Sequence, residues 1–144
     1  MNESDIEAVY ANLDFPVHNA PAWRPYTFIN MVATIDGKVI SGARGEEVGD
    51  LGSNVDHLLM RRIERAADAV LIGAESQRSS PGIWYPPGVK RIVVTRSGNV
   101  LAESRFFTDE PRSAWVFCTD ESTLPTLPGG VSVVSFPGDA VMVG

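Results

Sequence analysis

The stretch Ala-Val-Leu-Ile-Gly, residues 69–73, decides the fold because it is an unbroken apolar run that ends in glycine. Short apolar runs without alternating polar residues are typical of strands that are covered on both faces of a parallel sheet. Further apolar runs follow at residues 91–95, 114–118 and 131–136, and polar or turn-rich segments separate them. This alternation predicts an α/β domain with a mostly parallel central sheet flanked by helices.

The segment before this first run predicts a helix. Ser53 is a suitable N-cap, and Asp56, three positions later, resembles the second member of a capping box. Apolar residues recur at helical spacing and form one stripe, made of Val55, Leu58, Leu59, Ile63 and Ala66. Arg61, Arg62 and Arg65 lie largely off this stripe, where they form either a solvated face or a contact for a ligand phosphate.

The amino-terminal part of the chain divides into an arm and a strand. Residues 1–23 are expected to form an arm, because two prolines within it prevent a continuous helix. Residues 24–37, Arg-Pro-Tyr-Thr-Phe-Ile-Asn-Met-Val-Ala-Thr-Ile-Asp-Gly, predict a buried strand that runs into a turn. Such a strand delivers Thr34, Asp36 and Lys38 to one strand end, where α/β folds tend to bind ligands.

Composition limits the class of protein. The chain has 144 residues, of which 44% are hydrophobic, and this is enough for one globular domain. A net charge of −6 argues against a nucleic-acid-binding face, although it leaves room for a local phosphate pocket. No apolar run approaches the roughly 20 residues of a membrane span, and the first residues lack the pattern of a signal peptide. We therefore expect a cytoplasmic protein that acts on a small molecule and does not bind a membrane.

Several common chemistries have no counterpart in the sequence. Cys118 is the only cysteine, so an internal disulfide is impossible and a cysteine-based zinc site is disfavoured. His18 and His57 do not have the spacing of metal ligands, and no metal site is expected. The dinucleotide-binding G-x-G-x-x-G turn, the P-loop and the hydrolase G-x-S-x-G elbow are all missing.

Two turns are candidates for ligand binding. Residues 73–76 leave the first apolar run through a glycine, which allows a ligand to approach the backbone, and a helical turn there would offer free N–H groups to a phosphate. Thr95, Arg96 and Ser97 leave the next run with two hydroxyls and a guanidinium, which suit a phosphate monoester. Each turn, taken alone, is equally compatible with an ordinary connection between elements.

The order of these pieces along the chain is more specific than any one of them. In sequence they are Arg-Pro-Tyr (24–26), Asn-Met-Val-Ala-Thr-Ile-Asp-Gly-Lys (30–38), a glycine-rich loop, the helix after Ser53, Ala-Asp-Ala-Val-Leu-Ile-Gly-Ala (67–74) and Arg-Ile-Val-Val-Thr-Arg-Ser-Gly (91–98). This order resembles the pyrimidine reductase domain of riboflavin biosynthesis, which has a dihydrofolate-reductase-like fold. The resemblance covers residues 24–136 and is strongest at 24–40 and 66–76.

The resemblance implies an NADPH-dependent oxidoreductase. Members of the family reduce 5-amino-6-(5-phosphoribosylamino)uracil to the ribitylamino product, by hydride transfer from the nicotinamide to C1′ of the opened ribose. They often occur joined to a deaminase, whose His-x-Glu and Pro-Cys-x-x-Cys zinc motifs are missing from this chain. The resemblance also implies a homodimer, which an unpaired sheet edge would favour.

Roles for individual residues follow from the same resemblance. Asp36 would be the catalytic residue at the junction of substrate and cofactor. The cofactor-binding positions would be Ala33 and Thr34 beside the nicotinamide, then Gly73, Ala74 and Ser76, and finally Thr95, Arg96 and Ser97 at the adenosine phosphate. The positions on the substrate side would be Asn30, Lys38 and Arg62.

The chain departs from the family mainly on the substrate side. Some members have lysine at the position of Asn30, Glu64 stands where a substrate-contacting arginine is usual, and Ser79-Ser80-Pro81 replaces Asp-Asp-Pro. The glycine-rich turn that holds the cofactor pyrophosphate in the family is not found before Gly144, so residues 24–144 are expected to form a partial reductase domain. Two alternatives remain open: a reductase of another small substrate, and an inactive relative that binds a nucleotide or simply dimerises.

Overall fold

The computed structural model describes residues 6, 8–31, 33, 35 and 53–138. Its centre is a four-stranded sheet in which every pair of neighbouring strands is parallel. The strands lie side by side in chain order and are β1 (Ala69–Gly73), β2 (Lys90–Val94), β3 (Ala114–Thr119) and β4 (Ser132–Phe136). The predicted α/β class and parallel sheet are confirmed, and each strand begins and ends within one residue of its apolar run.

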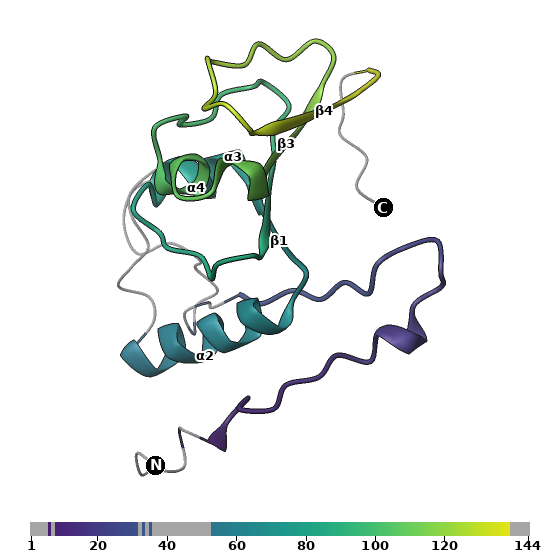
Figure 1. The fold of residues 1–144 in the computed structure, drawn as a ribbon, viewed down its shortest axis with the longest axis vertical. Helices are drawn as coiled ribbons and strands as arrows, with labels where there is room; N and C mark the ends of the chain where they lie inside the picture. Colours follow the sequence, from purple (N-terminus) through teal and green to yellow (C-terminus); the bar gives the residue numbers. More distant parts are fainter. Residues whose placement is uncertain (1–5, 7, 32, 34, 36–52, 139–144) are drawn as a thin grey trace.

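Two short helices connect the strands on one side of the sheet (Figure 1). The first, α3 (Ala74–Ser79), joins β1 to β2, and α4 (Arg105–Thr108), followed by the 3₁₀ turn η2 (Pro111–Ser113), joins β2 to β3. Right-handed crossovers between neighbouring parallel strands place successive connections on the same face. The core forms between this face and α4, where Phe106 and Phe107 pack against Val93, Val116 and other buried residues.

The opposite face of the sheet is only half covered within the described residues. Ile92, Trp115 and Phe117 point to this face and lie outside the core cluster. At one margin of this face, on β3 and β4, the Phe117 and Phe136 rings lie 5.6 Å apart. At the other margin, on β1, the side chain of Leu71 is 51% exposed. The expectation that the strand is covered on both faces is therefore wrong for β1, whose residues on this face are exposed, whereas Ile92, Trp115 and Phe117 of β2 and β3 are partly buried there.

A longer helix, α2 (Asn54–Ala66), precedes the sheet. Ser53 is its N-cap, as predicted, and its hydroxyl accepts a hydrogen bond from the Asp56 amide at 3.2 Å. The apolar stripe is less buried than expected, since Leu58 is 41% exposed and the one buried residue of the helix is Glu64. None of the helices in the described part of the chain has the length and apolar character needed to cross a bilayer.

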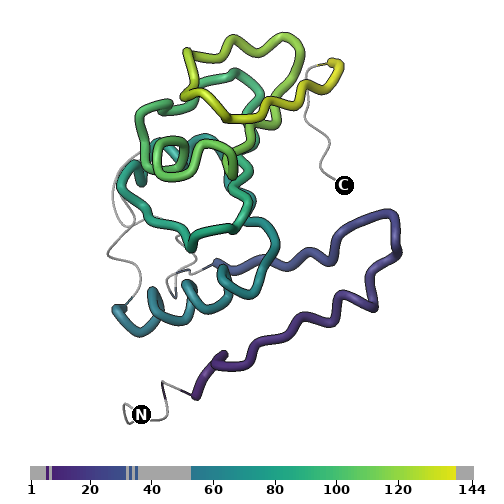
Figure 2. The backbone as a smooth tube through the Cα atoms, viewed as in Figure 1, coloured from purple at the N-terminus to yellow at the C-terminus, as the bar shows by residue number. Residues whose placement is uncertain are grey.

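The arm before α2 does not join the sheet. The predicted buried strand at 24–37 is wrong for the residues that are described there (24–31, 33 and 35), which have no strand structure and are exposed. Instead the chain turns at η1 (Val17–Asn19), so that the Phe28 ring stacks on Phe15 at 4.5 Å. Figure 2 shows this arm as a long excursion from the body of the molecule. A strand-forming sequence needs a neighbouring strand, and no described strand pairs with this one.

Candidate functional site

The candidate site lies at the carboxyl ends of β1 and β2. These strands are parallel neighbours, and Gly73 pairs with Val94 at the end of the ladder. The two predicted ligand turns, which begin at Gly73 and at Thr95, therefore leave the sheet side by side. Crevices at the carboxyl ends of parallel strands are the usual ligand sites of open α/β sheets.

The turn after β2 is held tightly by its own backbone. Thr95 is buried, its amide donates to the Phe117 carbonyl at 2.9 Å, and its hydroxyl accepts from the Gly98 amide at 3.0 Å. Gly98 has a φ of +80°, and a Cβ there would lie 2.3 Å from the carbonyl oxygen of Thr123. This geometry requires glycine at position 98 and fixes the backbone on which Arg96 stands.

Two residues that were not predicted from the sequence support the same turn. The hydroxyls of Thr119 and Ser122 both donate to the backbone oxygen of Arg96, at 3.2 and 2.7 Å. The Ser122 hydroxyl also accepts from the Thr119 amide at 3.1 Å. The sequence contains one signal for these two residues. A polar stretch follows the apolar run that ends at Cys118, just as Thr95, Arg96 and Ser97 follow the apolar run of β2.

The side chains of Arg96 and Ser97 face solvent. The Ser97 hydroxyl accepts from the Asn99 amide at 3.3 Å and so stays within the turn. The guanidinium of Arg96 makes no hydrogen bond or ion pair with any other residue that the structure describes. A rigid backbone that carries an exposed arginine without a partner is a suitable binding element for a phosphate or carboxylate.

The turn after β1 combines an open position with a buried anchor. A Cβ added at Gly73 would meet no atom of the described residues within 4 Å, so this part of the chain leaves room for a ligand to approach the backbone there. Ala74 packs against the core, whereas Ser76 is exposed. The buried residue of α3 is Gln77, which donates to the Leu101 carbonyl at 2.9 Å and accepts from the Leu101 amide at 2.9 Å.

The remaining predicted site residues are not brought to this edge within the described part of the chain. The guanidinium of Arg62 donates to the carbonyl oxygens of Ile6 and Val9 at 2.6 and 2.5 Å, and it therefore anchors the arm. Because α2 ends just before the amino end of β1, Arg62 lies at the other end of that strand from Gly73. Asn30 and Ala33 are exposed on the arm. Thr34, Asp36 and Lys38 lie outside the described residues.

Arginines of α2 and β2 also meet aromatic rings near the amino ends of the strands. The guanidinium of Arg61 lies 5.7 Å from the Trp84 ring and 5.9 Å from the Tyr85 ring, and Arg61 also pairs with Glu64 at 2.5 Å. Arg61 is thus a packing residue and not part of a solvated face. Burial, with a smaller contribution from the charge of Glu64, raises the pKa of Tyr85 to about 12.

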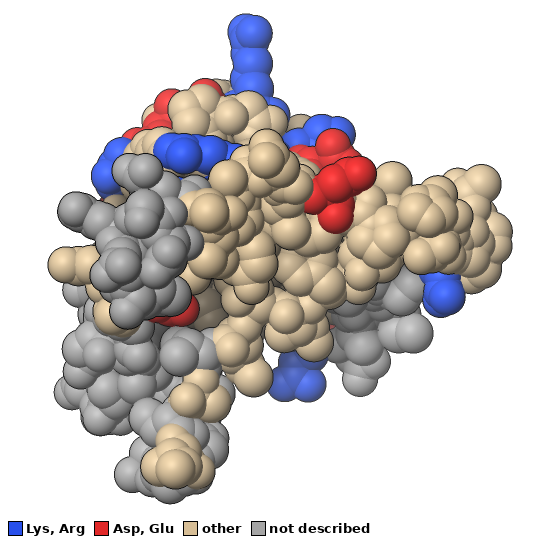
Figure 3. Space-filling model, turned by 90° about the horizontal axis from the view of Figure 1, so that it is seen from below, with Lys and Arg blue, Asp and Glu red and all other residues tan. Residues whose placement is uncertain are grey.

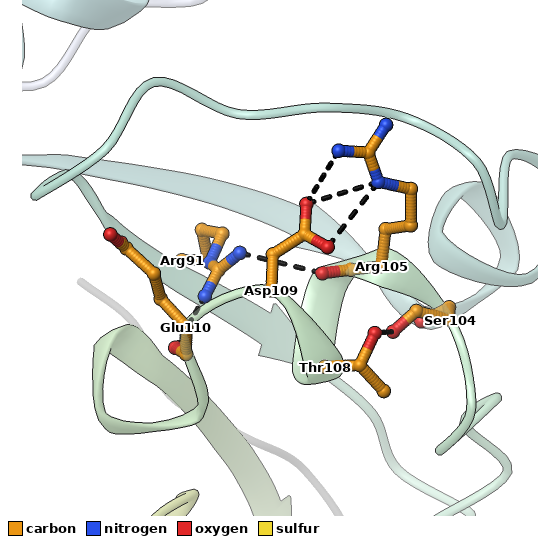
Figure 4. Close-up of polar contacts among 6 residues, drawn as sticks. All are labelled: Arg91, Ser104, Arg105, Thr108, Asp109 and Glu110. Carbon is orange, nitrogen blue, oxygen red and sulfur yellow. Dashed lines mark hydrogen bonds and ion pairs between the residues drawn. The ribbon is translucent and has the colours of Figure 1, made fainter.

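A cavity of about 250 Å³ opens beside Tyr85, and Arg91 and Glu110 are among the residues that line it. The Nε of Arg91 is buried without a hydrogen-bond partner among the described residues, whereas its other guanidinium nitrogens are engaged. Figure 4 shows Arg91 turned toward the end of α4, where it donates to the carbonyl oxygens of Glu110 at 2.5 Å and Arg105 at 3.5 Å. The Arg105 side chain in turn pairs with Asp109 at 2.9 Å. Burial lowers the pKa of Arg91, and the neighbouring carboxylates oppose this effect. These contacts close the carboxyl end of α4, which is a structural role.

Within the described residues, no group of three or more histidine, cysteine, aspartate or glutamate side chains is placed to hold a metal ion. Comparison of the chain with protein families, with curated proteins and with solved structures gave no match. The arguments for function therefore rest on the residues themselves, and above all on Gly73 and Arg96 at the carboxyl ends of β1 and β2.

Proposed function

We propose that this chain is an NADPH-dependent reductase of the riboflavin-pathway type, with a dihydrofolate-reductase-like fold, that reduces 5-amino-6-(5-phosphoribosylamino)uracil. The proposal rests on the resemblance of residues 24–136 to that family. It is supported by the parallel α/β sheet and by the adjacency of the two turns that the resemblance assigns to the cofactor. In this proposal the protein acts as a homodimer on a small phosphorylated substrate.

The observation that carries the proposal is an open strand end beside an exposed arginine that has no partner among the described residues. Gly73 has free space where a side chain would stand, and Arg96 presents its guanidinium from a rigid turn on the neighbouring strand. Both features fit a phosphorylated dinucleotide, because arginine binds phosphate oxygens through two parallel N–H donors. NADPH, when bound, supplies the hydride.

The residues of the chain would bind and orient the two ligands. Arg96 would hold the 2′-phosphate of the adenosine, and the Gly73 backbone would allow the cofactor to lie close to the sheet. Asp36, Asn30 and Lys38 would act on the substrate side, as the resemblance implies.

Cofactor titration of Arg96→Ala tests the proposal. We expect the Kd for NADPH to rise by about tenfold or more, because the 2′-phosphate loses its partner, whereas the Kd for NADH changes little. Quenching of tryptophan fluorescence measures both. Arg112→Ala is the matched control, since Arg112 is also an exposed arginine but lies in η2, before the amino end of β3. An equal loss for NADPH and NADH would remove Arg96 from the phosphate site.

A nucleotide-binding protein without reductase activity is the second candidate. It is favoured by the positions of Asn30, Ala33 and Arg62, which do not lie at the carboxyl ends of β1 and β2. NADPH that binds but is not oxidised when the phosphoribosylaminouracil is added would support this candidate. Oxidation with a different carbonyl or imine compound would instead indicate a reductase of another small substrate.

A further inference from the structure

The arm carries large apolar side chains that are not covered by any described part of the chain. Trp23 is 78% exposed, Ile29 is 86% exposed and Met31 is 68% exposed. Figure 3, which views the molecule from below, shows that uncharged residues make up most of the described surface on this side, with Lys and Arg in small separate groups. Several large apolar side chains exposed close together in one segment often mark an interaction surface.

The backbone of the same segment is also without partners. Residues 25–31 make no backbone hydrogen bond with any other described residue, although the run Tyr-Thr-Phe-Ile-Asn-Met (26–31) is rich in strand-forming side chains. The inner side of the arm is already engaged, because Phe15 stacks on Phe28 and Arg62 holds the carbonyls of Ile6 and Val9. The arm is thus fixed to its own chain while one long side of it stays open.

The sheet has a matching open edge at β1. Within the described residues β1 pairs only with β2, so its other side presents unpaired amide and carbonyl groups. Exposed edge strands are normally protected by charged residues or proline, yet β1 reads Ala-Val-Leu-Ile-Gly and has neither. Leu71, at the middle of this edge, is 51% exposed.

We propose that two copies of this chain associate by strand addition, in which residues 25–31 of one copy pair with the open edge of β1 in the other. A single contact of this kind gives hydrogen-bond partners to the backbone of the arm in one copy and to the β1 edge in the other. A two-fold axis repeats it, so that both arms and both β1 edges are paired in a closed dimer. The inference identifies the two surfaces of the dimer and does not depend on which ligand the protein binds.

Single lysine substitutions on the two surfaces test the proposal. Ile29→Lys on the arm and Leu71→Lys on β1 are each expected to raise the dimer dissociation constant at least roughly tenfold, as measured by analytical ultracentrifugation. Two matched controls should change it little: Val17→Lys, also on the arm and 60% exposed in the wild type, and Val133→Lys, 47% exposed on the opposite edge strand β4. All four positions are exposed, so the variants should fold, and circular dichroism checks this.

Mixing the two interface variants distinguishes strand addition from general apolar association. In a mixed dimer, the intact arm of the Leu71→Lys copy can pair with the intact β1 edge of the Ile29→Lys copy. We therefore expect the mixture to form dimers at concentrations where each variant alone is monomeric. Hydrogen exchange of the wild type should also show that residues 25–31 and β1 gain protection together as its concentration rises.

Three results would overturn the inference. The first is a wild-type protein that stays monomeric throughout the micromolar range. The second is a wild-type dimer that Val133→Lys weakens as much as Leu71→Lys does. The third is a mixture of the two interface variants that associates no better than either variant alone.

Discussion

At the scale of single residues, Gly98 is the position where the strand-end turn tolerates a side chain least. We expect Gly98→Ala to lower the free energy of unfolding by more than about 2 kcal/mol, because a left-handed backbone and a clash with the Thr123 carbonyl act together. Gly88→Ala is the control, since Gly88 has a φ of +82° but open space around its Cβ, and its cost should be near 1 kcal/mol. Denaturant unfolding measures both, and equal costs would contradict the predicted clash.

Tyr85 gives the protein a specific dependence on alkaline pH. Its pKa is raised from the usual 10.0 to about 12, so the unfolded chain ionises first and holds fewer protons in this interval. Stability should be unaffected by this residue below pH 10.0 and should fall by about 2 kcal/mol as the pH rises toward 12. In Tyr85→Phe this part of the decrease in stability should be missing, because phenylalanine does not ionise. A variant with an unchanged alkaline profile would show that Tyr85 is not buried as described.

At the scale of elements, Gln77 joins α3 to the loop before α4. Gln77→Ala would leave the part-buried Leu101 amide without its partner and would remove one of the two hydrogen bonds to the Leu101 carbonyl, which also accepts from the Ser104 amide. We expect a loss of about 1 to 3 kcal/mol. Ser76→Ala, which changes the exposed neighbour, should cost less than about 0.5 kcal/mol. Thermal unfolding of the two variants makes the comparison, and similar midpoints would contradict the role of Gln77.

Elements were predictable where their signal is local. The four apolar runs and the Ser53 cap depend on residues close together in sequence, and the structure has them within one residue. Residues 24–35 carry an equally strong strand pattern, but a strand also needs a neighbouring strand to pair with. The local sequence does not indicate whether such a neighbour is present. The predicted strand therefore failed for a reason that the pattern itself could not reveal.

The candidate site follows the same rule. The turns after Gly73 and Val94 were predicted as two separate ligand turns, and they lie together because β1 and β2 are parallel neighbours in the sheet. The support from Thr119 and Ser122 depends on the register between β2 and β3, where Val94 pairs with Phe117. Register is set by packing across the sheet, so the sequence did not indicate that these hydroxyls would reach Arg96.

At the scale of the whole molecule, the sheet has one protected and one unprotected side. The core between the sheet and the helices α3 and α4 is closed, and its largest buried side chain, Phe107, is completely covered. The other face and the β1 edge remain open within the described residues, as does the outer side of the arm. In the proposed dimer, assembly and stability are linked, and the unfolding midpoint of the wild type should therefore rise with protein concentration.

The order of the strands also determines how the sheet can form in time. In the described sheet β1 pairs with β2, β2 with β3 and β3 with β4, so each pair of neighbouring strands is also consecutive in the sequence. The contact order of the sheet is correspondingly low for a parallel architecture, in which non-local pairing usually slows folding. During synthesis, β2 can pair with β1 as soon as it emerges, and β3 and β4 can then be added one at a time to the growing edge.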